Sequence, residues 1–300
     1  MTAHNKDSNG LINMPLGISF SIGEVIFTVG IAAIVKLISN DVSVFTILFF
    51  RYLFCLPLLF ITAYFQRGRD ALQIQNKGIL GLRSLFGIAS FGFLFAALQT
   101  VELSKMTALL QTIPVFVTLL APLLIGETVG WRRRIAVLVG FIGVALIIQP
   151  SNDGWFHTGI LFGILSPFFG ALMFLTLRRL GQSDHPASTA VWYNMAGAAV
   201  FLSVSIACGV AWPSSFEVLI VLGAIGVMSS FQQFFLANSF KFAPASTLAP
   251  LRYLSVPIGV GLSIIMFDEV ITSSFYIGSA VLIAASFFII KRTEKNSKTT

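Results

Sequence analysis

The chain has 300 residues, of which 56% are hydrophobic and only 10% are charged, and its mean hydropathy is +0.89. A soluble protein of this length needs far more charge to cover its surface, so the composition excludes a pair of soluble domains. The formal net charge of +7 would favour nucleic acid as a partner in a soluble chain, but the placement of the cations has another explanation and no nucleic-acid partner is expected.

Ten apolar segments follow the polar N-terminal residues, and most have the length of about 20 residues that an α-helix needs to cross a bilayer. In chain order they are 16–37, 45–64, 79–98, 106–125, 135–149, 159–177, 190–211, 218–240, 243–267 and 275–290. The fifth is short, and we expect it to include residues 129–134, whose arginines can reach the interface. The sequence therefore predicts an all-α integral membrane protein embedded in the lipid bilayer, without a cleavable signal peptide.

The two halves of the chain repeat each other at a constant offset of 142 residues, which places Gly126-Glu127 on Asp268-Glu269. Five apolar segments then fall on five without a gap, although few residues are identical. Because five crossings is an odd number, the second copy is inverted in the membrane, and inverted repeats are typical of secondary transporters. We expect two five-helix repeats and two polar tails, with the boundaries 1–13, 14–149, 156–292 and 293–300.

Lysines and arginines gather on one side of the predicted membrane. With the N-terminus inside, 14 of the 19 cations fall in cytoplasmic loops and tails, whereas the outer loops carry acids such as Asp41 and Asp153. Cytoplasmic loops of membrane proteins are enriched in Lys and Arg. We therefore expect a multi-pass protein of the cell inner membrane with both termini in the cytoplasm.

Prolines mark the fourth and ninth segments, which occupy equivalent places in the two repeats. Pro114 lies in the fourth, Pro250 and Pro257 lie in the ninth, and Pro167 lies in the sixth. Proline removes a backbone donor and kinks a helix, so the freed carbonyls must face protein or a water-filled cavity. Paired interrupted helices indicate the substrate site of a transporter, although proline is also common in transmembrane helices in general.

Glu24 is the only carboxylate well inside a predicted helix, and its repeat equivalent is Ser166. A carboxylate at membrane depth marks a substrate, ion or proton site by default. Glu24 is therefore the candidate for substrate binding and for proton coupling. The alternative is a structural carboxylate that pairs with an arginine or accepts hydrogen bonds from Ser and Thr.

Arg252 lies near the predicted membrane midplane, and its repeat equivalent is the uncharged Leu110. A guanidinium suits a carboxylate or phosphate on a substrate, and the alternative is an internal ion pair with Glu24. The next residue, Tyr253, aligns with Gln111. We expect both to face the cavity if Arg252 does.

Four further polar residues have two interpretations each. Arg51 either contacts substrate or reaches the outer headgroups, and Arg83 either lines the cavity or anchors the inner side. Gln232 and Asn238 either line the cavity or form hydrogen bonds between helices.

Three other features of the sequence indicate structural roles. Glu127 and Glu269 follow the fourth and ninth segments and are expected to cap the next helix, while Gly140 and Gly143 suit close helix packing. The three histidines lie far apart, no Cys/His cluster has metal-ligand spacing, and there is no phosphate loop. We therefore expect no catalytic centre, metal or cofactor.

The chain resembles the drug/metabolite transporter superfamily, specifically its ten-helix EamA-type permeases, over about residues 14–292. The resemblance rests on the repeat, Phe-Phe-Arg-Tyr at 49–52, Leu-Arg-Ser at 82–84, the Gly126-Glu127 turn and Ala-Pro-Leu-Arg-Tyr at 249–253. The last stretch, followed by Phe-x-Glu at 267–269, is most similar to the branch that contains S-adenosylmethionine and riboflavin uptake permeases. The resemblance implies a central cavity among helices one, three, four, six, eight and nine, within reach of Glu24 and Arg252.

These patterns predict a permease that moves a small polar organic metabolite, such as a vitamin or a nucleoside-like or amino-acid-like compound, by alternating access. An exporter of amino acids or toxic compounds with the same fold is the alternative. A membrane enzyme would need clustered intramembrane His, Asp or Glu, and a channel would need repeated polar rings. The sequence leaves open import or export, proton coupling and whether the protein forms a homodimer.

Overall fold

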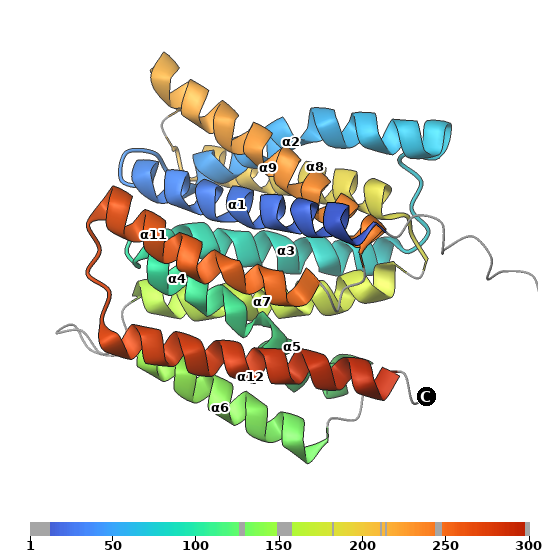
Figure 1. Cartoon of the computed structure of the whole chain (residues 1–300). Helices are drawn as coiled ribbons and strands as arrows, with labels where there is room; N and C mark the ends of the chain where they lie inside the picture. Colours follow the sequence, from blue (N-terminus) through green and yellow to red (C-terminus); the bar gives the residue numbers. More distant parts are fainter. Residues whose placement is uncertain are drawn as a thin grey trace, which may run out of the picture.

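A computed structural model describes residues 13–125, 130–148, 158–181, 183–210, 212–213, 215–243 and 248–297, and every regular element among them is helical (Figure 1). Seven of these helices are long and apolar enough to cross a membrane, and three shorter apolar helices accompany them. The predicted fold class, an all-α multi-pass membrane protein, is thus confirmed.

The helices of the first half follow the predicted segments closely. They are α1 (Met14–Ile38), α2 (Val44–Arg67), the 3₁₀ turn η1 (Gly68–Asp70), α3 (Lys77–Leu98), α4 (Leu103–Leu109), η2 (Leu110–Thr112), α5 (Ile113–Ile125) and α6 (Trp131–Ile148). Because α6 starts at Trp131, it includes the three arginines at 132–134 that were expected to extend the fifth segment.

The helices of the second half are α7 (Thr158–Leu180), α8 (Pro186–Ala207), α9 (Phe216–Phe242), η3 (Ala249–Leu254), α11 (Ser255–Phe267) and α12 (Ser273–Ser297). Helix α12 continues to Ser297, seven residues beyond its predicted end at 290. Helix α8 was expected over 190–211 and lies four residues earlier. Pro186 suits the first turn of a helix, and His185 Nδ1 accepts a hydrogen bond from the Ala187 amide. The chain leaves the helix at its other end where Gly209 adopts a φ of +60°.

Helix packing reproduces the 142-residue repeat in space. Helix α1 packs along α9, and the equivalent helices α7 and α3 pack along each other (Figure 1). The rings of Phe27 and Phe235 lie 5.4 Å apart across the first pair, and their equivalents Phe169 and Phe93 lie 5.4 Å apart across the second. The repeat in the sequence is therefore also a repeat of packing.

Helices α6 and α12 cross at two glycines. A Cβ added to Gly143 would lie 2.9 Å from the carbonyl oxygen of Gly278, and one added to Gly278 would lie 2.7 Å from the carbonyl oxygen of Gly143. No larger residue allows the two backbones to approach this closely without a shift. The predicted close packing of the fifth segment against the tenth is confirmed.

The fourth and ninth segments are interrupted at equivalent places. Helices α4 and α5 are separated by the 3₁₀ turn η2, and η3 precedes α11. Leu110 and Arg252, which are equivalent in the repeat, both lie in these 3₁₀ turns. Pro114 follows the first break, Pro250 lies within η3 and Pro257 lies in the first turn of α11.

Pro167 is a correction to the sequence prediction, because α7 runs through it without a break. A proline inside a membrane helix is tolerated where neighbouring helices supply hydrogen bonds to the backbone. Helix α3 contacts α7 at this place, where the Ser90 hydroxyl donates a hydrogen bond of 2.9 Å to the carbonyl oxygen of Ser166.

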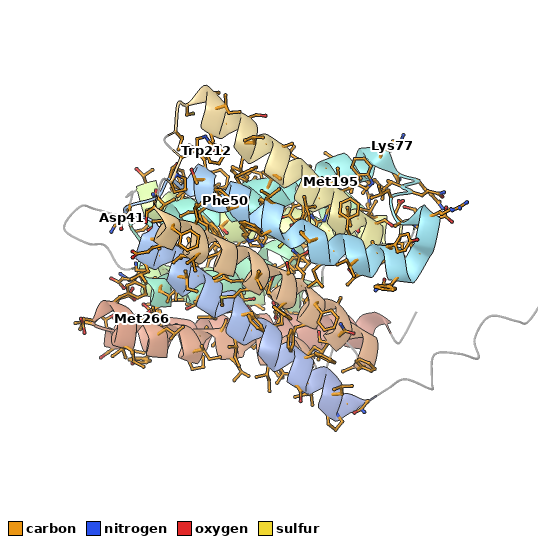
Figure 2. All side chains as sticks on the ribbon, turned by 90° about the horizontal axis from the view of Figure 1, so that it is seen from above. Asp41, Phe50, Lys77, Met195, Trp212 and Met266 are labelled. Carbon is orange, nitrogen blue, oxygen red and sulfur yellow. The ribbon has the colours of Figure 1, made fainter. Side chains whose placement is uncertain are left out.

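The two ends of the bundle carry the turns that the alternating topology requires. Figure 2 shows Asp41 and Trp212 at one end of the molecule and Lys77 at the opposite end. Asp41 follows α1 and Trp212 follows α8, so the two turns that were expected outside do lie together. The assignment of this end to the outside remains the prediction made from the charges.

Candidate functional site

Glu24 is the centre of a polar cluster between α1 and α9. Glu24 is 2% exposed, and its Oε1 atom accepts a hydrogen bond of 3.0 Å from the Thr28 hydroxyl, one helical turn away. Gln232 of α9 donates from Nε2 to Thr28 Oγ1 at 3.1 Å and to Glu24 Oε1 at 3.4 Å. The structure therefore brings together two predicted site residues and adds Thr28, which its i+4 spacing from Glu24 could have indicated.

Arg252 reaches this cluster from η3. Its Nη2 atom lies 3.7 Å from Glu24 Oε1, and the two side chains are 38% and 3% exposed. This distance exceeds the value of about 2.7–2.9 Å that is typical of charge-assisted hydrogen bonds. The guanidinium also lies 5.7 Å from the ring of Phe174 in α7. Arg252 is thus held loosely by a buried carboxylate and an aromatic ring, and donors remain available for another acceptor.

The charged cluster occupies only one of the two positions related by the repeat. Ser166 and Ser90 are the equivalents of Glu24 and Gln232, and they also meet, through the hydrogen bond from Ser90. Leu110 stands where the other position has Arg252. The packing is symmetric, but the charge is not, so the charged pair is not a requirement of the fold.

No hydrogen bond among the described residues joins Gln111 or Tyr253 to Arg252, so their place in one cavity stays a prediction. Gln111 Nε2 donates a hydrogen bond of 2.6 Å to Ser255 Oγ, which links η2 to the first turn of α11. The hydroxyl of Tyr253 is buried beside Ser286, whose own hydroxyl donates to the Gln111 carbonyl. Asn238 Nδ2 donates to the Phe234 carbonyl in its own helix.

Arg51 and Arg83 are not interfacial anchors. Arg51 is 2% exposed and its Cζ lies 3.9 Å from the ring centroid of Phe91, while Arg83 Cζ lies 3.7 Å from that of Tyr193. Nε and Nη1 of both are buried without a hydrogen-bond partner among the described residues. A desolvated cation–π contact contributes about 2 kcal/mol, whereas burial of an unpaired charge costs several kcal/mol. The ring contacts therefore offset only part of the cost.

Two tyrosines join the arginines across the repeat. The hydroxyl oxygens of Tyr52 and Tyr193 lie 2.8 Å apart in a buried hydrogen bond, with their rings edge to face at 5.4 Å. The Tyr52 ring also lies 5.0 Å from Arg51 Cζ. A Cβ added to Gly197 would lie 2.7 Å from this ring, so Gly197 makes room for it. Neither tyrosine was singled out from the sequence.

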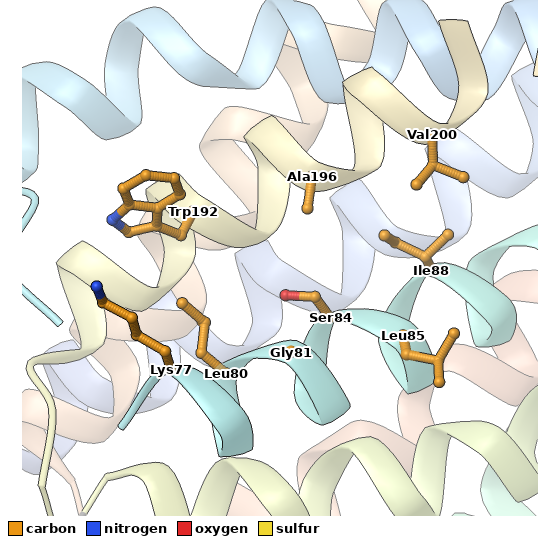
Figure 3. Close-up of a pocket in the computed structure, with 9 residues that line it drawn as sticks. All are labelled: Lys77, Leu80, Gly81, Ser84, Leu85, Ile88, Trp192, Ala196 and Val200. Atoms are coloured by element: carbon orange, nitrogen blue, oxygen red, sulfur yellow. The ribbon is translucent and has the colours of Figure 1, made fainter. Parts of the chain in front are cut away.

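A separate groove of about 390 Å³ lies between α3 and α8 (Figure 3). Its walls are mostly apolar, and Lys77 and Trp192 lie together at one end. The partly exposed Leu85 and Val200 indicate that the groove opens on the outer surface of the bundle. It is therefore distinct from the cluster around Glu24.

Glu269 caps a helix, but not the one expected. Its carboxylate accepts from the Leu103 amide at 2.8 Å and from the Ser104 hydroxyl at 2.9 Å, at the start of α4, and Lys36 Nζ lies 3.6 Å away. Burial alone would raise the pKa of Glu269, but these bonds and the Lys36 charge outweigh it and lower that pKa. The carboxylate thus ties the turn after α11 to α4 and α1. Glu127 lies outside the described residues.

Known proteins resemble this chain over most of its length. The model of the EamA-like transporter family matches residues 15–149 and again 157–291. An S-adenosylmethionine uptake transporter from Rickettsia prowazekii (strain Madrid E) is 29% identical over 265 residues, which cover 87% of each chain. A riboflavin transporter from Vibrio cholerae serotype O1 is 29% identical over 231 residues, which cover 77% of each chain.

One solved structure shares the fold. A crystal structure of a protein that is 16% identical in sequence superposes with a TM-score of 0.62, over 94% of this chain and 100% of the other. At that identity the likeness concerns the arrangement of the helices alone.

Proposed function

Because this chain belongs to the EamA-like transporter family, we propose that it imports a small polar organic metabolite across the inner membrane by alternating access. That it is a multi-pass membrane transporter, and not an enzyme, follows from the family and from the relatives. The direction, the substrate and the coupling are the parts that we propose.

The contact between Arg252 and Glu24 carries the proposal for the substrate. An amino-acid-like substrate presents a carboxylate and a cationic group, and the two side chains offer the complementary charges at one place. S-Adenosylmethionine, named for one set of relatives, carries both groups, whereas riboflavin has neither. We therefore favour a zwitterionic metabolite of the S-adenosylmethionine class over a flavin.

An aromatic side chain near the cluster suits the rest of such a molecule. Phe174 lies beside Arg252, with its ring 5.7 Å from the guanidinium. A nucleobase or another planar ring gains from stacking on phenylalanine. Thus the site combines a charged centre with the aromatic ring of Phe174.

Glu24 is the proposed coupling residue. Its Oε1 atom receives the hydrogen bond from Thr28 and faces Arg252. A proton taken up by Glu24 would release Arg252 for the substrate carboxylate, and loss of that proton would restore the negative charge that pairs with the cationic group of the substrate. The 3₁₀ breaks beside this site, bridged by Gln111 and Ser255, offer points at which the two repeats can bend between inward-open and outward-open states.

Uptake into proteoliposomes tests this function. Purified protein reconstituted with an inward proton gradient is expected to accumulate labelled S-adenosylmethionine in preference to riboflavin. Ser203→Ala, at an exposed position of α8 where the hydroxyl donates to the Ala199 carbonyl of its own helix, serves as the control and is expected to transport normally. Uptake of riboflavin alone, or efflux without uptake, would contradict the proposal.

A further inference from the structure

Two buried guanidiniums without a carboxylate partner lie apart from the Glu24 cluster. Arg51 projects from α2 and Arg83 from α3, and they contact opposite members of the Tyr52–Tyr193 pair. No salt bridge joins either arginine to an acid in the described part of the chain. By contrast, Arg252, which is more exposed, has Glu24 beside it.

Few acceptors face these two charges in the described part of the chain. The guanidinium is a donor-only group with five N–H bonds, and Nε and Nη1 of both arginines have no hydrogen-bond partner there. The hydroxyls of the tyrosine pair bond to each other, and the Tyr193 hydroxyl also lies within hydrogen-bonding range of Arg83. Arg51 faces the rings of Phe91 and Phe95 as well. An oxyanion would satisfy the donors and neutralise the charge, because planar guanidinium groups match carboxylate and phosphate oxygens.

We propose that Arg51 and Arg83 form a second binding site, between α2, α3 and α8, for a small oxyanion such as a carboxylate or a phosphate group. Each guanidinium donates to the oxyanion while its face remains on Phe91 or Tyr193. The tyrosine pair contacts both arginines and links α2 of the first repeat to α8 of the second.

The surroundings favour a soluble oxyanion over the phosphate of a lipid. The groove on the outer surface of α3 and α8 is lined by Ser84 and Trp192, the chain neighbours of Arg83 and Tyr193 (Figure 3). Arg83 and Tyr193 themselves do not line it. An acyl chain in this groove would lie against walls that include neither arginine.

Thermal unfolding of the purified protein tests the site without any transport measurement. The protein is placed in phosphatidylcholine nanodiscs, and inorganic phosphate, or acetate in a second series, replaces chloride at constant ionic strength and pH. We expect a saturable rise in Tm for the wild type. The matched control Arg69→Gln, an exposed arginine in η1, is expected to respond equally. Arg51→Lys and Arg83→Lys are expected to bind phosphate at least about tenfold more weakly, since lysine keeps the charge but loses the planar fork.

Methionine variants keep the test decisive if a lysine variant fails to fold. Arg51→Met and Arg83→Met remove an unpaired buried charge, so the ligand-free protein is expected to be at least as stable as the wild type but insensitive to phosphate. Equal phosphate responses in wild type and all variants would overturn the site, as would an unresponsive wild type. Failure of all four variants to fold would show that the arginines are structural and would overturn it too.

Two further measurements identify the source of the oxyanion. Stabilisation by phosphatidylglycerol nanodiscs but not by phosphate or acetate would assign the site to lipid and contradict the proposal. Competition between phosphate and substrate uptake would show that the substrate carries the oxyanion, whereas binding without competition would show a separate soluble anion. Both of these last results support the site, and neither depends on which metabolite is transported.

Discussion

The carboxylate of Glu269 accepts a hydrogen bond from the backbone amide of Leu103, 166 residues earlier in the chain. The turn after α11, in the second repeat, thereby caps a helix of the first repeat, and Lys36 adds a positive charge to the same carboxylate. A carboxylate at a helix N-terminus is stabilised by the unpaired amides there. The contact therefore fastens the two repeats together at the predicted outer end.

Replacement of Glu269 by Gln should lower stability at neutral pH by about 1.5–3 kcal/mol, the usual contribution of a hydrogen bond to a charged group. The pKa of Glu269 is below its ordinary value of 4.5, so the carboxylate stabilises the fold above that value. This contribution is lost as pH falls through the lowered pKa. Thermal unfolding should therefore show a gap between wild type and Glu269→Gln at pH 7 that closes below about pH 4. A gap that is constant with pH would contradict the role of the charge.

The crossing of α6 and α12 should not tolerate a side chain. Gly143→Leu is expected to destabilise the protein by about 1–3 kcal/mol or more, because the added atoms would overlap the backbone at Gly278. Gly81→Ala is the matched control, since nothing lies within 4 Å of a Cβ at Gly81. Detergent-solubilised thermal stability measures both. Equal stability of the two variants would show that the helices separate readily there.

The predicted orientation can be tested by cysteine labelling in a background with Cys55→Ala and Cys208→Ser. A cysteine at Asp41, in the turn after α1, is expected to react with an impermeant maleimide in intact cells. A cysteine at Arg69, in η1 at the other end, should react only after lysis, because the positive side faces the cytoplasm. The reverse pattern would invert the topology.

The sequence predicts the helices and their order well because the bilayer thickness sets the length of each apolar segment. The interruptions near Leu110 and Arg252 were also predictable, because proline has no backbone N–H to donate and disrupts a helix at its position. Rotation about the helix axis was not, because these helices are apolar on all sides. From the sequence, Arg51 could therefore equally well have reached the lipid headgroups, but in the structure its side chain is buried.

The sequence identified candidate site residues but not which of them are in contact. Glu24 and Gln232 lie 208 residues apart and meet only because α1 packs along α9. The repeat register relates equivalent residues, but it does not say which helices touch. Pro167 shows the converse error, because the residue type indicated a break but α7 continues through it, packed against α3.

Glu24→Gln should slow transport by at least about tenfold while leaving folded protein in the membrane, because an ionisable group at membrane depth is normally functional. Glutamine keeps the hydrogen bonds with Thr28 and Gln232 but cannot gain or lose a proton. The pH dependence of uptake should therefore flatten. A variant with wild-type uptake and an unchanged pH profile would restrict Glu24 to a packing role.

The central claim is that Arg252 binds the substrate, and the affinity of purified Arg252 variants for labelled S-adenosylmethionine tests it most directly. Arg252→Lys is expected to weaken binding by about tenfold or more, since the planar fork is lost, and Arg252→Ala should weaken it further. In the double variant Glu24→Gln with Arg252→Gln, no buried charge is stranded, so the fold should recover while binding stays absent. Wild-type affinity in Arg252→Lys and Arg252→Ala alike, or restored binding in the double variant, would contradict the account.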